Sequence, residues 1–411
     1  MSAERRCVLY LNHGAKPSGA EFALLRMLGA LDRTQVRPII IFGEDGPAAD
    51  LAREIGVETH VIPMAVKIRE VRKDTLNAGA FMHMGRLWSF VGYAIVIAQF
   101  AMTHGVDVIH TNTIKAHLYG ALAGRIAGLP VIWHLRDYVN ESYLPPAAVK
   151  VVRALARFAP RHIIAVSRSV LEQLHLGKNR QKASVVLDGL TERELEAECG
   201  TLASRDPNAG PHIGIVGRLA QWKGQHVFLE AAEKVVAAGI DAHFSIIGAA
   251  LFGEEEYEME LRRQVEALGL NDRVQFRGFR RDVTGELRNL SILVHASTTG
   301  EPFGQVIVEG MAVGLPVVAS CGGGVPEIIT HGENGLLTKM GDSTELAEAI
   351  IFLVRQPEDA KRLGAAGYDH VHANFRVARG ARQLEALYGR VVSGAARQPL
   401  EAQLQPNCEI R

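Results

Sequence analysis

Strand-like apolar runs alternate with segments of helical length along almost the whole chain. Each run is short, and the segment after it is long enough for the helix that joins two parallel strands. Because parallel strands need such a crossover, the alternation predicts an α/β fold with parallel sheets. Strands are predicted at residues 6–11, 37–42, 59–62, 106–110, 131–134, 162–166 and 183–187, and then at 212–216, 242–247, 274–277, 291–295, 316–320 and 335–338.

The two series of strands predict two domains. A length of 411 residues is more than one hydrophobic core usually serves. We predict a Rossmann-like N-terminal domain at residues 1–190, a linker at 191–210 that is acidic and then turn-rich, and a second Rossmann-like domain at 211–375. A C-terminal helix at 376–395 and a loose tail at 396–411 follow. Helices are predicted at residues 20–31, 224–238, 254–268, 306–313, 343–355, 357–372 and 377–391.

The cysteines and the N-terminus indicate a cytoplasmic protein. Cys7, Cys199, Cys321 and Cys408 form no C-x-x-C pair, which argues against a zinc site or a disulfide framework and fits a reducing compartment. The opening residues MSAERRCVLYL lack the apolar core of a secretion signal. Residues 87–102 carry no charge, but they fall short of the ~20 residues that span a bilayer. We therefore expect a buried crossover helix there.

The net charge of zero hides an asymmetry between the two halves. Residues 1–190 hold 23 Lys and Arg against 15 Asp and Glu, and residues 191–411 hold 22 against 30. A basic N-terminal half attracts an anionic surface or acceptor, and the basic amphipathic piece at 67–73 would suit peripheral attachment to the inner face of the membrane. Ordinary solvated faces explain the same charges, so both interpretations stay open. Nucleic acid is not an expected partner.

Residues 300–320, GEPFGQVIVEGMAVGLPVVAS, contain two carboxylates eight residues apart. Glu301 lies in a Gly/Pro loop, and Glu309 lies in the predicted helix that follows. A helix start offers backbone N–H groups and a partial positive charge to a phosphate. Carboxylates beside it accept hydrogen bonds from hydroxyls instead. A nucleotide sugar supplies both kinds of group.

The pattern E-P-F-G-x-V-x-x-E-G-M-A-x-G-L-P-V-V resembles the donor-site signature of retaining glycosyltransferases of the GT4 group, also called group 1. The likeness extends over almost the whole chain, and it implies the GT-B fold, in which two Rossmann-like domains with parallel sheets face a central cleft and the last helix packs back toward the first domain. Its further pieces are Gly217-Arg218-Leu219, Lys223-Gly224, Gly322-Gly323-Gly324, Pro326-Glu327 and Asn334-Gly335.

Two cations follow the strand at 212–216. Arg218 and Lys223 are thereby placed at the carboxyl edge of a sheet, where open α/β folds bind ligands. Fixed cations stabilise the charge that a diphosphate gains as the glycosidic bond breaks, and the resemblance assigns the diphosphate to this pair. The sequence has no Asp-x-Asp pair to hold a divalent metal on the phosphates. We therefore predict metal-independent chemistry, with no cofactor besides the nucleotide-sugar co-substrate.

The resemblance assigns further contacts to the donor. Glu309 accepts the ribose hydroxyls, and Glu301 accepts hydroxyls of the transferred sugar. The N–H groups of Phe303, Gly304 and Gln305 lie near the sugar or phosphate, and Gly278 lies in the loop that meets the nucleobase. The glycine run at 322–324 lacks a dinucleotide fingerprint and is interpreted as a loop for backbone contact. The acidic residues 254–260 are interpreted as a solvated helix start.

The N-terminal half carries matching pieces. Gly19 and Gly14 offer close backbone approach to the donor, although Ser18 stands where the family has a glycine, which weakens the match at that residue. The resemblance places a histidine near the sugar, and His134 matches it in WHLRD. With Glu301, Arg218 and Lys223 it is a candidate catalytic residue, which would bind donor-sugar or acceptor groups or act as a general base. Candidate acceptor-side residues are Arg136, Asp137 and His110.

These features predict a retaining glycosyltransferase. Its donor is a nucleotide sugar, UDP-linked by first preference and GDP-linked by second. Its acceptor is a hydroxyl of a glycan or lipid-linked intermediate in cell-surface polysaccharide or glycolipid synthesis. The alternatives are a sugar-nucleotide epimerase of the same fold, a glycosyltransferase of secondary metabolism, and a catalytically silent binding protein.

Overall fold

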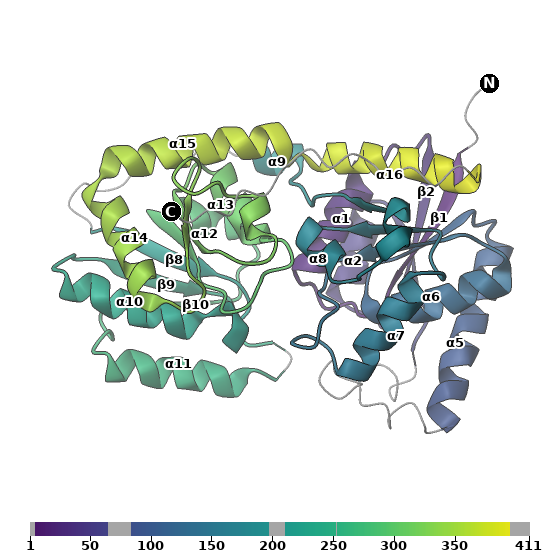
Figure 1. The fold of residues 1–411 in the computed structure, drawn as a ribbon, viewed down its shortest axis with the longest axis horizontal. Coiled ribbons are helices and arrows are strands. Elements are labelled where there is room, and N and C mark those ends of the chain that lie inside the picture. The colour runs from purple at the N-terminus through teal and green to yellow at the C-terminus, as the bar shows by residue number, and fades with distance from the viewer. Residues whose placement is uncertain (1–4, 65–83, 197–209, 252, 395–411) are drawn as a thin grey trace. The chain divides into compact units, whose positions relative to one another are not determined.

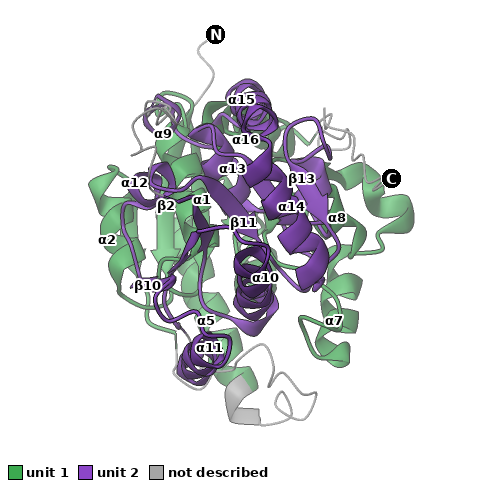
Figure 2. Ribbon diagram, turned by 90° about the vertical axis from the view of Figure 1, so that its left-hand side faces the viewer, with its two compact units in different colours: residues 1–189, 377–403 green, residues 190–376, 404–411 purple. Residues whose placement is uncertain are grey.

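The structure is a computed structural model that describes residues 5–64, 84–196, 210–251 and 253–394 (Figure 1). Its contacts divide the chain into two compact units, shown in green and purple in Figure 2. Unit 1 contains the described residues 5–189 and 377–394, and unit 2 contains Leu190–Arg376. The basic piece at 67–73, most of the predicted linker and the predicted tail lie outside the described residues.

Unit 1 is built on a parallel sheet of seven strands in the order β3-β2-β1-β4-β5-β6-β7. The order reverses between β1 and β4, and ligands bind at such a switch point in open α/β sheets. Aliphatic runs form these strands because both faces of the sheet are covered by helices. The strands are β1 (Arg6–Asn12), β2 (Val36–Phe42), β3 (Glu58–Val61), β4 (Val108–Thr111), β5 (Val131–Leu135), β6 (His162–Ala165) and β7 (Ala183–Val185).

The helices of unit 1 include the last helix of the chain. α16 packs against α1 and buries Leu384, Leu387 and Tyr388 in the core of this unit. Figure 1 shows it in yellow beside the purple N-terminal elements. The helices are α1 (Gly19–Ala30), α2 (Pro47–Glu54), α5 (Met84–Thr103), α6 (Ile114–Ala127), α7 (Pro146–Ala156), α8 (Arg168–Glu172) and α16 (Val377–Val392), with the 3-10 turn η2 (Gly177–Lys182).

Unit 2 is built on a parallel sheet of six strands in the order β10-β9-β8-β11-β12-β13. The strands are β8 (His212–Val216), β9 (His243–Ile247), β10 (Val274–Gly278), β11 (Ile292–His295), β12 (Val317–Ser320) and β13 (Leu336–Thr338). Its helices are α9 (Glu192–Leu195), α10 (Gln225–Ala237), α11 (Glu255–Ala267), α12 (Val283–Arg288), α13 (Gln305–Ala312), α14 (Ser343–Arg355) and α15 (Pro357–Asn374), with the 3-10 turns η4 (Gln221–Lys223) and η5 (Val325–Glu327).

The predicted α/β fold with parallel sheets is confirmed, and each predicted strand appears with its ends shifted by two residues or fewer. The six-residue helix α12 was not predicted. It is too short for helical periodicity to reveal it. Its start is fixed by Asp282, whose side chain accepts a hydrogen bond of 2.9 Å from the amide of Gly285.

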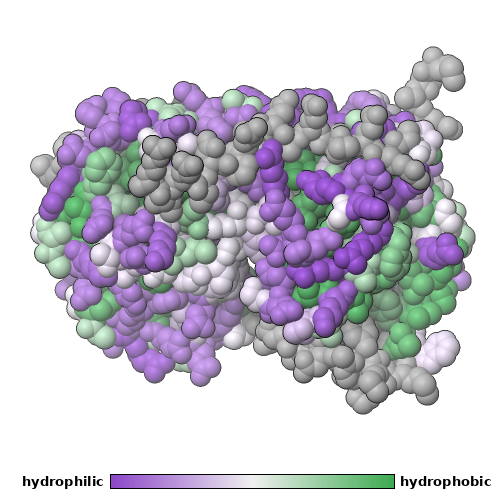
Figure 3. Space-filling model, viewed as in Figure 1, coloured by the Kyte–Doolittle hydropathy of each residue, from purple (hydrophilic) through white to green (hydrophobic). Residues whose placement is uncertain are grey.

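The prediction of a buried helix at residues 87–102 holds for one face only. α5 buries Tyr93, Ile97 and Ala101, whereas Trp88 is 69% exposed and Met102 is 54% exposed. α5 packs against α6, so one stripe of this uniformly apolar helix is covered and the opposite stripe is not. Figure 3 shows hydrophobic side chains gathered over α5 and α6. Within the described ranges, no helix is both long and apolar enough to cross a bilayer.

Candidate functional site

The centre of the candidate site is the start of α13 in unit 2. Gly304 is the N-cap of this helix, and its φ of +111° is a conformation that side chains with a Cβ rarely adopt. No side chain caps α13. Its first-turn amides and the positive end of its dipole therefore suit an anion.

Three polar side chains converge on one oxygen of Glu301 beside this helix start. Lys223 Nζ lies 2.7 Å from Glu301 Oε2, Ser297 Oγ lies 3.2 Å from it and His295 Nε2 lies 3.3 Å from it. Burial alone would raise the pKa of Glu301, but the charge of Lys223 and the hydrogen bond from His295 hold the pKa well below its ordinary 4.5. Glu301 is therefore a carboxylate that only accepts hydrogen bonds.

Two loops approach each other closely to bring Lys223 to Glu301. Lys223 ends η4, and Gly224 follows with a φ of +73°. A Cβ on Gly224 would lie 1.9 Å from the carbonyl oxygen of Ala296, in the loop after β11. The amide of Thr298 also donates to the carbonyl of Trp222 at 2.8 Å. The family glycine is thus required by this close approach, which fixes the position of the lysine.

Arg218 is also paired with a carboxylate. It follows Gly217 at the carboxyl end of β8, and its Nη1 lies 2.5 Å from each carboxylate oxygen of Glu254. The interpretation of Glu254 as a solvated acid is wrong, because only 26% of its side chain is exposed and it faces Arg218. Burial raises the pKa of Glu254, and Arg218 opposes that rise. The neighbouring Glu255 and Glu256 are exposed, as expected.

The remaining predicted donor residues of unit 2 lie on and around the same loops. Glu309 is half-buried on α13, and Phe303, which precedes this helix in the sequence, is buried. The side-chain nitrogen of Gln305 is buried without a hydrogen-bond partner. Gly278 ends β10 with a φ of +66°, and its carbonyl accepts from Gly248 at 3.0 Å. The amide of Gly324 donates to the carbonyl of Glu301 at 2.7 Å, so the glycine run holds the backbone that carries the central carboxylate.

Four aromatic side chains of unit 1 form a buried hydrogen-bonded series that ends at His134. The hydroxyls of Tyr10 and Tyr388 are 2.6 Å apart, and Tyr388 lies 2.9 Å from His110 Nδ1. His110 Nε2 in turn lies 3.2 Å from His134 Nδ1. Burial lowers the pKa of His110 to about 3 and that of His134 well below 6.5, and the nearby Arg136 adds to both effects. Both imidazoles are therefore neutral.

Hydrogen bonds can run along this series in two directions, and we predict the one in which Tyr10 is the first donor. Among the described residues, Tyr388 is the only partner of the Tyr10 hydroxyl, so Tyr10 must donate to Tyr388 or leave its own proton unpaired. A buried unpaired donor costs roughly 1–3 kcal/mol. If Tyr10 donates, Tyr388 donates to His110 Nδ1, and His110 Nε2–H donates to His134 Nδ1. His134 then carries its proton on Nε2, the buried nitrogen that has no partner within the described part of the protein, and this N–H is the donor left for a ligand. The reverse direction would leave the Tyr10 proton unpaired instead.

The other predicted residues near His134 serve internal contacts. Arg136 is 7% exposed; its Nη1 pairs with both oxygens of Asp188, and its Nε donates to Asn112 Oδ1 at 2.8 Å. Asp137 accepts a hydrogen bond from the Tyr143 hydroxyl. The guanidinium of Arg136 is thus held in a buried ion pair, while its Nη2 has no hydrogen-bond partner among the residues that the structure describes. Its acceptor-side role stays a prediction.

The glycine loop after β1 is organised by its polar neighbours. Asn12 Nδ2 donates to the carbonyl of Gly14 at 2.6 Å. Ser18, which departs from the family pattern, is the N-cap of α1, and its amide donates to Glu21 Oε2 at 3.1 Å. A Cβ on Gly19 would meet no atom within 4 Å. Space therefore remains beside Gly19, while Ser18 is used to begin the helix.

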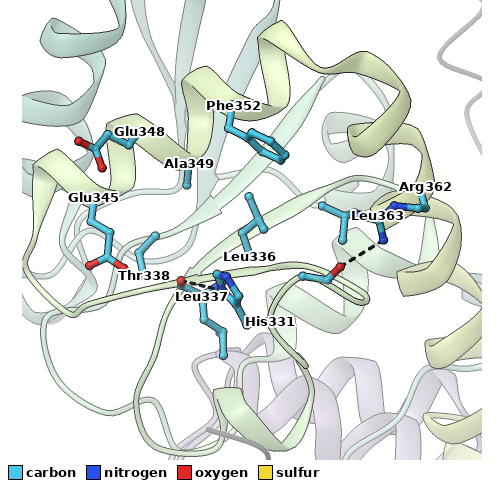
Figure 4. A pocket seen from close by; sticks show the side chains of 11 residues that line it. His331, Leu336, Leu337, Thr338, Glu345, Glu348, Ala349, Phe352, Arg362 and Leu363 are labelled. Atoms are coloured by element: carbon cyan, nitrogen blue, oxygen red, sulfur yellow. Dashed lines mark hydrogen bonds between the residues drawn. The ribbon is translucent and has the colours of Figure 1, made fainter. Parts of the chain in front are cut away.

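A surface pocket of about 420 Å³ lies elsewhere in unit 2, beside β13, α14 and α15 (Figure 4). Leu336, Leu363 and Phe352 give it an apolar lining, and Glu345 and Arg362 supply charges. His331 Nδ1 accepts from the amide of Leu337 at 3.0 Å. None of the predicted donor or acceptor residues lines this pocket.

Sequence reasoning missed several residues of the site. His295, Ser297 and Glu254 contact predicted residues, and Tyr388 and Tyr10 orient a predicted histidine. His295 and Ser297 close the strand before the Glu301 loop, so the rule that ligands bind at carboxyl strand ends could have found them. Tyr388 carries no such signal, because it lies 278 residues from His110.

The two parallel α/β sheets match the GT-B fold of the glycosyltransferases, and unit 2 adds a cationic and carboxylate cluster at a helix start. Two family models match the chain: "Glycosyltransferase Family 4" over residues 17–191 and "Glycosyl transferases group 1" over residues 204–370. The chain belongs to the GT4-type, group 1 glycosyltransferases.

Several known proteins are similar to this chain. The N-acetyl-alpha-D-glucosaminyl L-malate synthase of Bacillus anthracis is 28% identical over 71% of this chain and 77% of its own length. The lipopolysaccharide core biosynthesis mannosyltransferase LpcC of Rhizobium leguminosarum is 31% identical over 48% of this chain and 55% of its own length. The crystal structure of Anabaena Alr3699/HepE in complex with UDP and glucose is 28% identical, with a TM-score of 0.78, and the match covers 92% of this chain and 98% of that one.

The direction of the tyrosine–histidine series can be measured by NMR on protein labelled with ¹⁵N-histidine. We expect His134 Nε2 to carry a proton and Nδ1 to be bare, with the signals assigned by loss in His134→Gln. Tyr388→Phe removes the donor to His110, so the fixed tautomer of His134 should be lost. As a matched control, Tyr257→Phe removes a hydroxyl 2.9 Å from His226 Nδ1 in unit 2 and should leave His134 unchanged. A proton on Nδ1 of His134 in the parent protein would contradict the assignment.

The depressed pKa of Glu301 predicts a pH dependence of stability. Since the folded pKa lies below the unfolded value of 4.5, the carboxylate stabilises the protein above pH 4.5, and this contribution is lost as the pH falls below it. The unfolding temperature of Glu301→Gln should therefore lie below that of the parent at pH 7, and the gap should narrow below pH 4.5. Differential scanning calorimetry from pH 7 to pH 3 measures the gap, and a constant gap would show that this carboxyl does not titrate as described.

Proposed function

We propose that the protein is a retaining glycosyltransferase that moves a sugar from a nucleotide-sugar donor to an acceptor hydroxyl. The observation that carries the proposal is the cluster of Lys223, Glu301 and His295 at the uncapped start of α13. The cluster combines the Lys223 cation, the Glu301 carboxylate, which can accept hydrogen bonds from sugar hydroxyls, and the backbone amides at the helix start. A sugar diphosphate presents the matching anion and hydroxyls.

Arg218, Lys223 and the α13 amides bind the donor diphosphate in this proposal. Both cations are paired with carboxylates in the structure, to Glu254 and Glu301. When a diphosphate binds, its negative charges replace the two carboxylates as the partners of these cations. Because Glu254 is half-buried, its ion pair with Arg218 holds the guanidinium in position until the diphosphate replaces it. Charge that develops on the departing diphosphate then meets fixed cations.

The carboxylates select the hydroxyls of the donor. Glu301 accepts from the transferred sugar, and Glu309 on the same helix accepts from the ribose. The loop at Gly278 and the exposed Phe279 provide a surface for the base. UDP is our first choice of nucleotide, because the similar Anabaena protein has been crystallised with UDP and with UDP-glucose. GDP is the second choice.

His134 acts as a hydrogen-bond donor in the proposed reaction. With its proton on Nε2 and a pKa far below 6.5, it offers an N–H to a substrate hydroxyl oxygen and has no lone pair on that nitrogen to act as a base. The acceptor hydroxyl then loses its proton to the departing phosphate oxygen. The bond from that oxygen to the anomeric carbon breaks as the acceptor oxygen bonds on the same face, which retains the configuration.

The reaction is proposed to need no metal. The argument rests on the chain's own residues, since Arg218, Lys223 and the α13 amides supply the positive charge that a divalent ion supplies elsewhere, and the sequence lacks an Asp-x-Asp pair. Catalysis then depends on orientation and on charge stabilisation. A cytoplasmic location fits the use of nucleotide sugars and the cysteine pattern.

The acceptor class is proposed as a glycan or lipid-linked intermediate of cell-surface synthesis. The similarity to a lipopolysaccharide core mannosyltransferase supports it. The similarity to an N-acetyl-alpha-D-glucosaminyl L-malate synthase favours a second candidate, a small acceptor molecule that carries a hydroxyl. Product analysis with both acceptor classes separates the two.

Removing either cation should strongly reduce transfer. We expect Lys223→Ala and Arg218→Ala each to lower kcat/KM more than tenfold, because a lost diphosphate contact costs about 2 kcal/mol. Lys361→Ala on the exposed face of α15 is the matched control and should have the activity of the parent. Steady-state kinetics with the best donor measures the effect. Parental rates in both site variants would remove these cations from the reaction.

A panel of nucleotide sugars should identify the donor. A ligand that binds only the folded protein raises the unfolding temperature by mass action. We expect UDP-sugars to give the largest thermal shift and GDP-sugars the next, ahead of ADP- and dTDP-sugars. NMR of the donor incubated without acceptor is the companion measurement: a rearranged donor sugar would indicate the epimerase instead, and tight binding without turnover would indicate a silent binding protein.

A further inference from the structure

Two histidines and a glutamate of unit 1 lie together at the outer edge of its sheet. Glu58 and His60 are two residues apart in β3, so their side chains leave the same face of this edge strand. His104 follows the last residue of α5. One possible ligand atom from each of the three residues lies within 4.8 Å of the other two. None of these residues belongs to the proposed donor or acceptor site.

Neighbouring groups hold two of the three side chains in place. Arg37 Nη2 and Nε bind Glu58 Oε2 at 2.7 and 3.2 Å, which leaves Oε1 facing His60 Nε2 at 3.2 Å. His104 Nδ1 lies 2.9 Å from the carbonyl oxygen of Phe100. Because a carbonyl only accepts, Nδ1 carries the proton and the lone pair of this ring is on Nε2. Bonds of this kind orient metal-binding histidines and carboxylates in proteins.

The ring of Phe100 supports both histidines. His104 stacks on it with ring centres 3.8 Å apart, and His60 meets its edge with ring centres 4.8 Å apart. The side chains of Glu58 and His60 are each 36% exposed. An ion could therefore enter from solvent and keep a water molecule as a fourth ligand.

We propose that Glu58, His60 and His104 form a binding site for a divalent transition-metal ion, with Zn²⁺ the best fit. Two imidazole nitrogens and one carboxylate oxygen are a ligand set that suits Zn²⁺ and not Mg²⁺ or Ca²⁺. Ligand atoms around tetrahedral zinc lie roughly 3.4 Å apart, given Zn–N distances of 2.0–2.1 Å. His60 Nε2 and Glu58 Oε1 already have this spacing. In the metal-free protein Nε2 donates to the carboxylate, so zinc binding requires the tautomer of His60 with its proton on Nδ1. A small movement of His104 completes the ligand set.

The site is separate from the proposed transfer reaction. Glu58 opens β3 and His104 precedes β4, so both lie toward the amino edge of the parallel sheet. The ion would tie an edge strand to the end of α5 and so stabilise unit 1. The positive charge of Arg37 beside Glu58 weakens cation binding, so zinc should bind less tightly here than at a site without a neighbouring cation. The site uses no cysteine, so the absence of a C-x-x-C pair does not bear on it.

Zinc titration of the full chain, free of any affinity tag and treated with a chelator, tests the proposal. Isothermal titration calorimetry should show one Zn²⁺ per chain. His60→Ala and His104→Ala should each weaken binding at least tenfold, and Zn²⁺ should no longer raise their unfolding temperature. His243→Ala, which removes an exposed histidine of unit 2, is the matched control and should bind as the parent does.

Two outcomes would overturn the proposal: no saturable Zn²⁺ binding up to millimolar metal, or parental affinity in both histidine variants. If either alanine variant loses the circular dichroism spectrum of the parent, Glu58→Gln provides the same measurement with a smaller change in packing and should also weaken binding. The rate of glycosyl transfer should be the same with Zn²⁺ and with chelator, so a failed zinc titration leaves the proposed function untouched.

Discussion

The ion pair between Lys223 and Glu301 is the interaction on which the candidate donor site depends. It joins the loop after β8 to the loop after β11, 78 residues further along the chain. The pair is largely buried, with the side chains 19% and 12% exposed. A buried carboxylate needs its partners, and Glu301 has Lys223, His295 and Ser297 around one oxygen. Glycine at position 224 is required by the close approach of these two loops, and glycine at position 304 is favoured by its φ of +111° at the start of α13.

Pairing each cation with a carboxylate allows the site to hold positive charge before a donor arrives. Without their carboxylate partners the two cations would repel each other, and burying them would cost a large desolvation free energy. The Arg218–Glu254 and Lys223–Glu301 pairs avoid that cost and keep both side chains oriented. The uncapped start of α13 lies at the same loop. Unit 2 therefore holds oriented cations together with helix amides that no side chain caps. The two ion pairs carry no net charge.

In unit 1, a buried series of hydrogen bonds orients a neutral histidine, His134. The C-terminal helix α16 supplies Tyr388 from the far end of the sequence, and β1 supplies Tyr10. Because each member of the series both donates and accepts, the direction at Tyr10 sets the tautomer of His134 at the other end. The same unit carries the exposed apolar stripe of α5 and the His60–His104 pair, both of which depend on how α5 lies against its neighbours.

The sequence by itself determined the fold class and the strands, and it predicted the residues that the structure gathers in the candidate donor site. Alternating apolar runs and helical segments require parallel sheets, and the spacing from Gly217 to Gly224 and from Glu301 to Glu309 carries the local geometry of two loops and a helix start. Such features depend on residues close in sequence, and local patterns report them well.

Tertiary structure alone decided which side chains meet. Glu254 lies 36 residues from Arg218, and Tyr388 lies 278 residues from His110, so no local pattern links them. The short helix α12 and the uncovered stripe of α5 also had to be observed, because a six-residue helix has too little periodicity and a uniformly apolar helix does not show which face is buried. Burial, proton direction and ion pairing are properties of neighbours in space, and those neighbours are set only when the whole chain packs.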